Sequence, residues 1–173
     1  ATGSEMDPFA VISDMSKNEK WGTASEHMKP KMSILDPEYT YSVSKKQTAA
    51  GTADMISHIC ENYFTNVKNA DVQARFAEGL LKNCFKYGPI ALEEPDNYDA
   101  RANLMWTASM AINGILSDGA EVSWCVHPME HELSAFYDIT HGEGLAILTP
   151  HWMDFALNDD TASKFADYAR NVW

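Results

Sequence analysis

From Ser44 to the last residue, apolar side chains recur at the three- and four-residue spacing of amphipathic helices. Ser44 and Gln47 have the spacing of a capping box, which predicts a helix over 47–66. Further helices are predicted over 70–87, from Asn97 or Asp99 through a stretch that Gly119 ends, over 128–135, over 142–157 and over 160–173. This pattern predicts a mostly α-helical fold.

The first 43 residues lack this periodicity. Two short apolar runs, Phe9–Ile12 and Met32–Leu35, are candidate strands, and Pro30 and Pro37 limit the length of the second one. Pro89 is expected to end the second helix, because proline lacks the backbone N–H that a helix interior uses. The chain therefore divides into a short β-containing segment, 1–43, and a helical region, 44–173.

Composition excludes several classes of partner. The chain has 25 acidic and 13 basic residues, a net charge of −12, which disfavours nucleic acid and anionic membranes. The longest run without a charged residue, 102–117, is shorter than the roughly 20 apolar residues of a membrane-spanning helix. No signal peptide is visible, and the three scattered cysteines, Cys60, Cys84 and Cys125, do not suggest a disulfide framework. We expect a soluble cytoplasmic protein.

Two clusters of possible metal ligands lie in the predicted helices. Asp54 and His58 are four residues apart among apolar neighbours, so both project from one face of their helix. His127 and His131 have the same spacing, and His141 follows ten residues later. Imidazole is the commonest protein ligand of transition metals, and facing helices of a bundle can build such a site with a carboxylate.

The spacing alone leaves alternatives open. A histidine on an apolar helix face is more often a hydrogen-bonded core residue, and an Asp/His pair is more often a local salt bridge. Pro128 disfavours helical conformation at His127, so His127 and His131 need not share a face. Periodicity does not decide which of these two histidines would bind a metal.

Three segments carry a resemblance to a known family: ATGSEMDPFAVISD, ILDPEYTYSVSKKQTAAGTADMISHICE and HPMEHELSAFYDITHGEGLAILTPHWM. Together they resemble the iron-containing (group III) alcohol dehydrogenases, and within them the butanol dehydrogenase-like members, over essentially the whole chain. The resemblance implies four metal ligands: Asp54, His58, His127 and His141. His131 would lie near the substrate or nicotinamide as a proton-relay candidate, with a structural role as the alternative. His27 and His151 match no ligand position and are expected to be surface or packing residues.

The same resemblance divides the chain into domains. Residues 1–43 would be the end of a nucleotide-binding α/β domain, in which Thr2, Gly3 and Ser4 approach the nicotinamide and phosphates. Residues 44–173 would be the helical metal-binding domain of a dehydroquinate synthase-like fold, incomplete at its C-terminal end. Since the chain contains no G-x-G-x-x-G phosphate loop, we expect a fragment of a longer protein. Family members are homodimers, and the same is expected here.

The implied activity is hydride transfer between NADP or NAD and a small aldehyde or primary alcohol such as butanal or butanol. Fe(II) is the expected metal, although zinc, nickel or manganese would also suit three imidazoles and a carboxylate. Glu61, Glu130 and Glu132 are near enough in sequence to orient the imidazoles, but each is more simply explained as a surface charge.

Two rival functions remain at this point. One is a metal- and NAD-dependent lyase of the dehydroquinate synthase type, which would use the same fold for elimination chemistry. The other is a non-catalytic helical domain with a structural metal or none. The HELSAFYDITHGEGLAIL segment resembles the alcohol dehydrogenase branch rather than the lyases.

Overall fold

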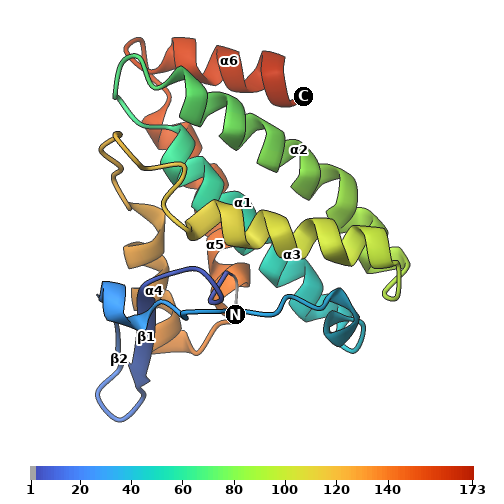
Figure 1. Ribbon diagram of the computed structural model, residues 1–173. Coiled ribbons are helices and arrows are strands. Elements are labelled where there is room, and N and C mark those ends of the chain that lie inside the picture. The colour runs from blue at the N-terminus through green and yellow to red at the C-terminus, as the bar shows by residue number, and fades with distance from the viewer. Residues whose placement is uncertain (1–2) are drawn as a thin grey trace.

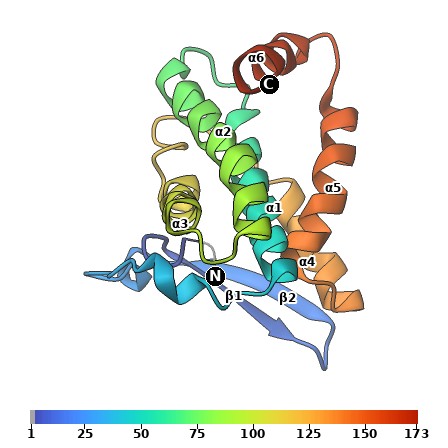
Figure 2. The same ribbon diagram turned by 90° about the vertical axis from the view of Figure 1, so that its right-hand side faces the viewer.

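A central helix, α1 (Lys45–Tyr63), organises the fold. The computed structural model describes residues 3–173. On one side α1 contacts α2 (Asp71–Glu93) and α3 (Tyr98–Ile112); on the other it contacts α5 (His141–Ala156), which also packs on α4 (Val126–Tyr137) (Figure 1). α6 (Ala162–Val172) covers one end of this bundle, and the N-terminal segment lies at the opposite end (Figure 2).

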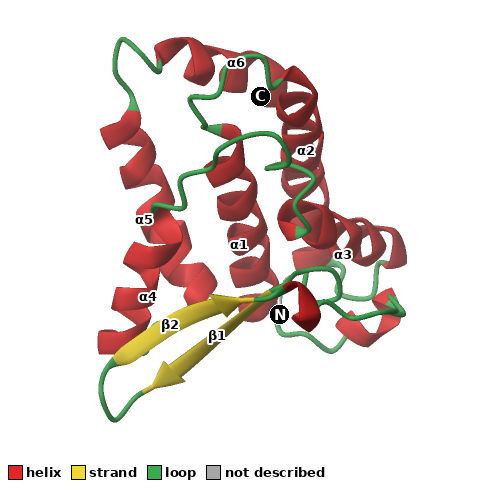
Figure 3. Ribbon diagram, turned by 60° about the vertical axis from the view of Figure 1, so that its left-hand side comes forward, coloured by secondary structure: helices red, strands yellow, loops and turns green. Residues whose placement is uncertain are grey.

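The N-terminal segment contains a two-stranded antiparallel hairpin that packs beside α4 (Figure 3). Strand β1 (Phe9–Asp14) pairs with β2 (Glu19–Ala24), with Phe9 opposite Ala24. Two short 3-10 helices, η1 (Glu26–Met28) and η2 (Pro37–Thr40), follow before Ser44 caps α1 by accepting a hydrogen bond from the Gln47 N–H.

The predicted helical class is confirmed, and the structure differs mainly at helix ends. The expectation that Pro89 ends the second helix is wrong, because α2 continues to Glu93. Pro89 removes one helical hydrogen bond, but the turn beyond it is anchored by Ala91, which is only 1% exposed in the core. α3 ends at Ile112 rather than near Gly119, because Gly114 adopts a positive φ of 104° shortly after it.

Of the two candidate strands, the first is confirmed as part of β1 and the second is wrong. Residues 32–35 form an irregular loop. The strand that pairs with β1 is instead Glu19–Ala24, which periodicity did not reveal because most of its side chains are exposed. Asn18 completes the turn between the strands with a positive φ of 53°.

The hydrophobic core fills the space where α1, α2 and α3 meet. Ile59, Cys60 and Leu81 are completely buried there. Burial raises the pKa of the Cys84 thiol to about 12, so this cysteine is a packing residue rather than a reactive one. Within residues 3–173, no helix is long and apolar enough to cross a membrane.

Candidate metal centre

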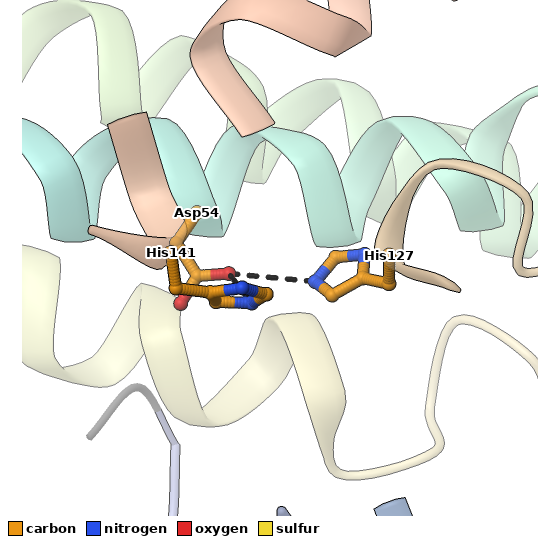
Figure 4. Close-up of side chains that lie close together, drawn as sticks. All are labelled: Asp54, His127 and His141. Carbon is orange, nitrogen blue, oxygen red and sulfur yellow. Dashed lines mark ion pairs between the residues drawn. The ribbon is translucent and has the colours of Figure 1, made fainter. Parts of the chain in front are cut away.

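Three helices bring the predicted ligands together. Asp54 and His58 lie in the middle of α1, His127 lies in the first turn of α4, and His141 is the first residue of α5. Pro128 does not displace His127, because the first turn of a helix does not use the N–H that proline lacks. His127 therefore lies in the first turn of α4 and faces Asp54 (Figure 4), while its role as the metal ligand stays a prediction.

A glycine allows α5 to begin directly against α1. Gly142 is buried, and a Cβ atom at this position would overlap the backbone carbonyl of Ala50. Only glycine permits this approach without a shift of one helix. Since His141 precedes this contact, the close approach sets the distance between His141 and the Asp54 side chain one turn further along α1.

The facing atoms of three residues converge on one point. The Oδ1 atom of Asp54 lies 3.5 Å from Nε2 of His127 and 3.8 Å from Nε2 of His141. One ligand atom from each of the three residues lies within 4.8 Å of the other two. Figure 4 shows both imidazoles directed toward the carboxylate.

Two of these atoms lack the partners that buried polar atoms normally have. Asp54 Oδ1 and His127 Nε2 are buried without a hydrogen-bond partner in the described part of the chain. An unsatisfied buried polar atom costs about 1–3 kcal/mol. Two such atoms facing each other at a carboxylate–imidazole cluster fit a bound metal cation, which would satisfy both. The donor set therefore suits a divalent transition metal.

The outer nitrogens of both imidazoles are held by carboxylates. Nδ1 of His127 contacts Glu61 Oε1, and Nδ1 of His141 contacts Glu130 Oε2. Because a carboxylate accepts the Nδ1 proton, Nε2 keeps its lone pair for the centre. The expectation of a surface charge is wrong for Glu61 and Glu130, which are 2% and 0% exposed, and correct for Glu132, which is exposed.

His58 lies beside this group but outside it. Its Nδ1 donates to the backbone carbonyl of Asp54 at 2.9 Å and lies 3.0 Å from Asp54 Oδ1. Its ring centre is 4.3 Å from that of His127. With the proton on Nδ1, the Nε2 atom of His58 has a lone pair that can bind a metal. The ligand role of His58 stays a prediction.

His131 is adjacent to the centre on the side of α4. Its ring centre is 5.6 Å from that of His141, and it forms a second group of possible ligands with Glu130 and His141. Burial and the nearby charge of Lys20 lower the pKa of His131 to about 4. His131 is therefore neutral at physiological pH.

The remaining predicted residues lie elsewhere. Thr2 is outside the described residues. Gly3 is buried with a φ of 77°, and a Cβ there would lie 2.8 Å from the Ala108 carbonyl oxygen of α3, whereas Ser4 is exposed. His27 and His151 are both on the surface.

The ionisable side chains of this cluster shift one another's pKa values strongly. Burial alone would raise the pKa of Asp54, but the imidazoles of His127 and His58 hold it well below its usual range. Burial opposes protonation of His127, yet the carboxylates of Asp54 and Glu61 raise its pKa to about 9. Without a metal, a proton on His127 thus balances the carboxylates around it.

A cleft of about 260 Å³ adjoins the centre through Trp124. The Trp124 ring packs edge-on against His58, at 5.8 Å, and against His127, at 5.4 Å. Phe9, Asn62 and Asp118 also line the cleft. The hairpin segment and the helical bundle thus share one cavity next to the proposed ligands.

A family model matches most of the chain. The model of the Fe-containing alcohol dehydrogenase family, C-terminal, matches residues 48–173. The chain belongs to this family. The match includes all four predicted ligands, and relatives in the family share sequence over the whole of this chain.

Two curated relatives illustrate the similarity in sequence. The NADH-dependent butanol dehydrogenase B of Clostridium acetobutylicum is 64% identical over 173 residues, which are 100% of this chain and 44% of the relative. The NADPH-dependent aldehyde reductase YqhD of Escherichia coli is 41% identical over 174 residues, again 100% of this chain and 44% of the relative. The chain thus spans less than half the length of these relatives.

Solved structures of the family have the same fold. The NADH-dependent butanol dehydrogenase A of Thermotoga maritima matches with a TM-score of 0.95 and 40% identity, over 100% of this chain and 43% of that one. The crystal structure of Escherichia coli YqhD also matches with a TM-score of 0.95, over 100% of this chain and 44% of that one. The predicted fold and family are thereby confirmed.

Sequence reasoning undervalued the supporting residues Glu61 and Glu130 and missed Lys20. A signal was present for the first two. Glu61 follows His58 by three residues and Glu130 follows His127 by three, so each shares a helix face with a predicted ligand. Lys20 gave no such signal, because its contact with Glu130 joins residues 110 positions apart.

Proposed function

We propose that this chain is part of a metal-dependent alcohol dehydrogenase or aldehyde reductase that transfers a hydride between NADH or NADPH and a small aldehyde or primary alcohol. The observation that carries the proposal is the convergence of Asp54 Oδ1, His127 Nε2 and His141 Nε2, of which the first two are buried without a hydrogen-bond partner among residues 3–173. Support for the substrate class comes from relatives named butanol dehydrogenases and aldehyde reductases.

Asp54, His58, His127 and His141 would hold the metal. A divalent metal bound there supplies a Lewis acid that polarises the substrate oxygen. The protein's part is to keep the ligands in place and limit access of water: Trp124 covers one side of His58 and His127. His131, neutral and next to His141, would accept or donate a proton near that oxygen.

The remaining assignments extend this proposal. Residues 1–43 would belong to a nucleotide-binding domain and 44–173 to the helical metal domain, in agreement with the family match beginning at residue 48. Thr2, Gly3 and Ser4 would lie at the nicotinamide. Iron is the metal that the family description favours, and the donor set also suits zinc, nickel or manganese. A homodimer in the cytoplasm stays a prediction.

The test uses the full-length polypeptide that contains this chain, purified without oxygen or chelators. Transition-metal content per chain is measured first by plasma mass spectrometry, and nicotinamide absorbance is then followed with butanal and reduced cofactor. Near-stoichiometric metal with aldehyde-dependent oxidation of the cofactor would support the proposal. Protein that binds no added Fe(II) or Zn(II) would contradict the metal centre, and metal without cofactor oxidation by any small aldehyde would contradict the reaction.

A further inference from the structure

We propose that Glu130, with Lys20 as its counter-ion, is a positioning residue that fixes the ring of His141 in the metal centre. The inference rests on the proposed metal centre and adds to it a pair of residues that do not touch the metal. It also links the hairpin, which carries Lys20, to the geometry of a ligand on α5.

Glu130 is a completely enclosed carboxylate near the centre. Its side chain is 0% exposed, and three donors from three different elements surround it. Lys20 Nζ lies 3.0 Å from Oε2, His141 Nδ1 contacts the same oxygen, and Ser134 Oγ contacts Oε1. A carboxylate is buried at tolerable cost only when it is paired and hydrogen-bonded in this way.

Glu130 determines which nitrogen of His141 carries the proton. Its Oε2 contacts His141 Nδ1, and an ionised carboxylate only accepts hydrogen bonds, so Nδ1 is the donor. Lys20 Nζ lies 3.0 Å from the same Oε2 and 3.2 Å from His141 Nδ1, and its positive charge keeps this carboxylate ionised. With its proton on Nδ1, His141 has a lone pair on Nε2, which lies 3.8 Å from Asp54 Oδ1.

The position of Lys20 also explains why a second group of possible ligands is not a metal site. This group consists of Glu130, His131 and His141. These three residues have ligand atoms close enough to hold an ion. However, the ammonium of Lys20 already lies against both Glu130 and His141, and it is only 11% exposed. Lys20 thus supplies the positive charge that balances this group, and Glu130 keeps its contact with His141.

The neighbouring helix leaves room for this carboxylate. Gly144 on α5 is buried, and a Cβ atom there would lie 2.8 Å from Cγ and 2.9 Å from Oε1 of Glu130. Any larger residue would push Glu130 away from Lys20 and His141. Glu130 thus has three hydrogen-bond donors, one of which is a paired cation, and it faces a glycine that leaves room for it. Together these features fix the orientation of the His141 imidazole.

The experiment compares Glu130→Gln with Glu132→Gln in the full-length polypeptide. Both changes remove one negative charge from α4, but Glu132 is exposed. Affinity for Zn(II) is measured by competition with a chelating dye, and the visible absorption of the Co(II)-loaded protein reports ligand geometry. We expect Glu130→Gln to weaken metal affinity by about 10- to 100-fold and to shift the Co(II) bands. Glu132→Gln should change neither.

A second pair of variants tests the route through His141. Lys20→Met should weaken metal affinity, and the double variant Lys20→Met/Glu130→Gln should lose no more than Glu130→Gln alone, because both residues act on the same ring. Gly144→Ala should reproduce the Co(II) shift, because it displaces Glu130 without altering its charge. Thermal unfolding of each variant identifies any variant that fails to fold. The metal affinities and Co(II) spectra of the folded variants then test the proposal.

Failure of this inference differs from failure of the proposed function. If the unchanged protein binds no metal, the proposed function fails with its centre. If the unchanged protein binds metal and a folded Glu130→Gln variant has the same affinity and the same Co(II) spectrum, only the positioning role is overturned. Additive losses in the double variant would likewise overturn the link through His141.

Discussion

At the scale of single residues, two of the proposed ligand imidazoles, those of His127 and His141, have a carboxylate on the outer side and Asp54 on the inner side. Glu61 holds His127 and Glu130 holds His141 through Nδ1. An imidazole fixed in this way loses little rotational freedom when its Nε2 binds a metal. Some residues would bind the metal and others would only orient its ligands. We therefore expect substitutions in the two groups to affect metal binding differently.

Asp54→Ala and His141→Ala should each abolish metal retention, whereas His131→Ala should keep the metal. The first two remove a proposed ligand atom, and the third removes a ring that lies beside the group. Elemental analysis of the purified variants measures this directly. Full metal occupancy in Asp54→Ala would contradict the ligand assignment, and loss of metal in a folded His131→Ala variant would make His131 a ligand.

The residues around the centre show what could be read from the sequence. The Asp54/His58 pair and His127, His131 and His141 are visible as spacings, and the structure brings them to one place. The burial of Glu61 and Glu130 was not visible, because a glutamate on a helix is usually a surface charge. These two glutamates are buried here because they contact residues more than ten positions away in the sequence.

At the scale of elements, the positions of the helices were predicted and several of their ends were not. Periodicity locates a helix by the face that it buries, whereas its end depends on local hydrogen bonding and on what packs there. α2 continues through Pro89 because Ala91 beyond it is in the core. β2 has no buried face, so it left no pattern in the sequence.

The contact between α5 and α1 gives a prediction about Gly142. Gly142→Ala should destabilise the protein and lower its metal content, because the added methyl group would overlap the Ala50 carbonyl and force α5 and His141 away from α1. Overpacking of this kind typically costs about 1–3 kcal/mol. Urea unfolding gives the change in stability, and elemental analysis gives the change in metal content.

Gly51→Ala is the matched control for that change. Gly51 lies in α1, next to Ala50, and a Cβ there would have no atom within 4 Å. Alanine is favoured over glycine within a helix by up to about 1 kcal/mol, so this variant should be equally or more stable and should keep its metal. Equal behaviour of the two variants would show that the close approach of α5 to α1 is not what positions His141.

At the scale of the whole molecule, the structure has a well-buried centre and a weakly buried end. α1 contains more buried residues than any other helix, whereas Val172 is the only buried residue of α6. α6 is attached largely by aromatic contacts: Phe165 stacks on Phe64 at 4.4 Å, and Tyr168 lies 5.5 Å from it. We therefore expect α6 to open before the rest of the bundle.

Phe64→Ala should increase amide hydrogen exchange in residues 162–172 and leave residues 126–137 unchanged. Loss of the aromatic contacts removes about 0.5–1.5 kcal/mol per pair beyond the loss of buried area. Hydrogen exchange followed by mass spectrometry resolves the two helices. Phe136→Ala, at an exposed position of α4, is the control and should leave α6 unchanged. Faster exchange of α4 in Phe64→Ala would contradict an independent opening of α6.

The residues packed around the two imidazoles also set an electrostatic balance. Three carboxylates, Asp54, Glu61 and Glu130, meet one ammonium group, Lys20, in an enclosure where Glu61 and Glu130 have no exposed side-chain surface. With neutral imidazoles, this enclosure carries two negative charges in excess. A doubly charged cation at the proposed centre would bring these groups to electroneutrality, whereas a singly or triply charged one would leave a net charge away from water. We therefore expect the proposed centre to prefer a divalent ion because of its charge as well as its ligand type.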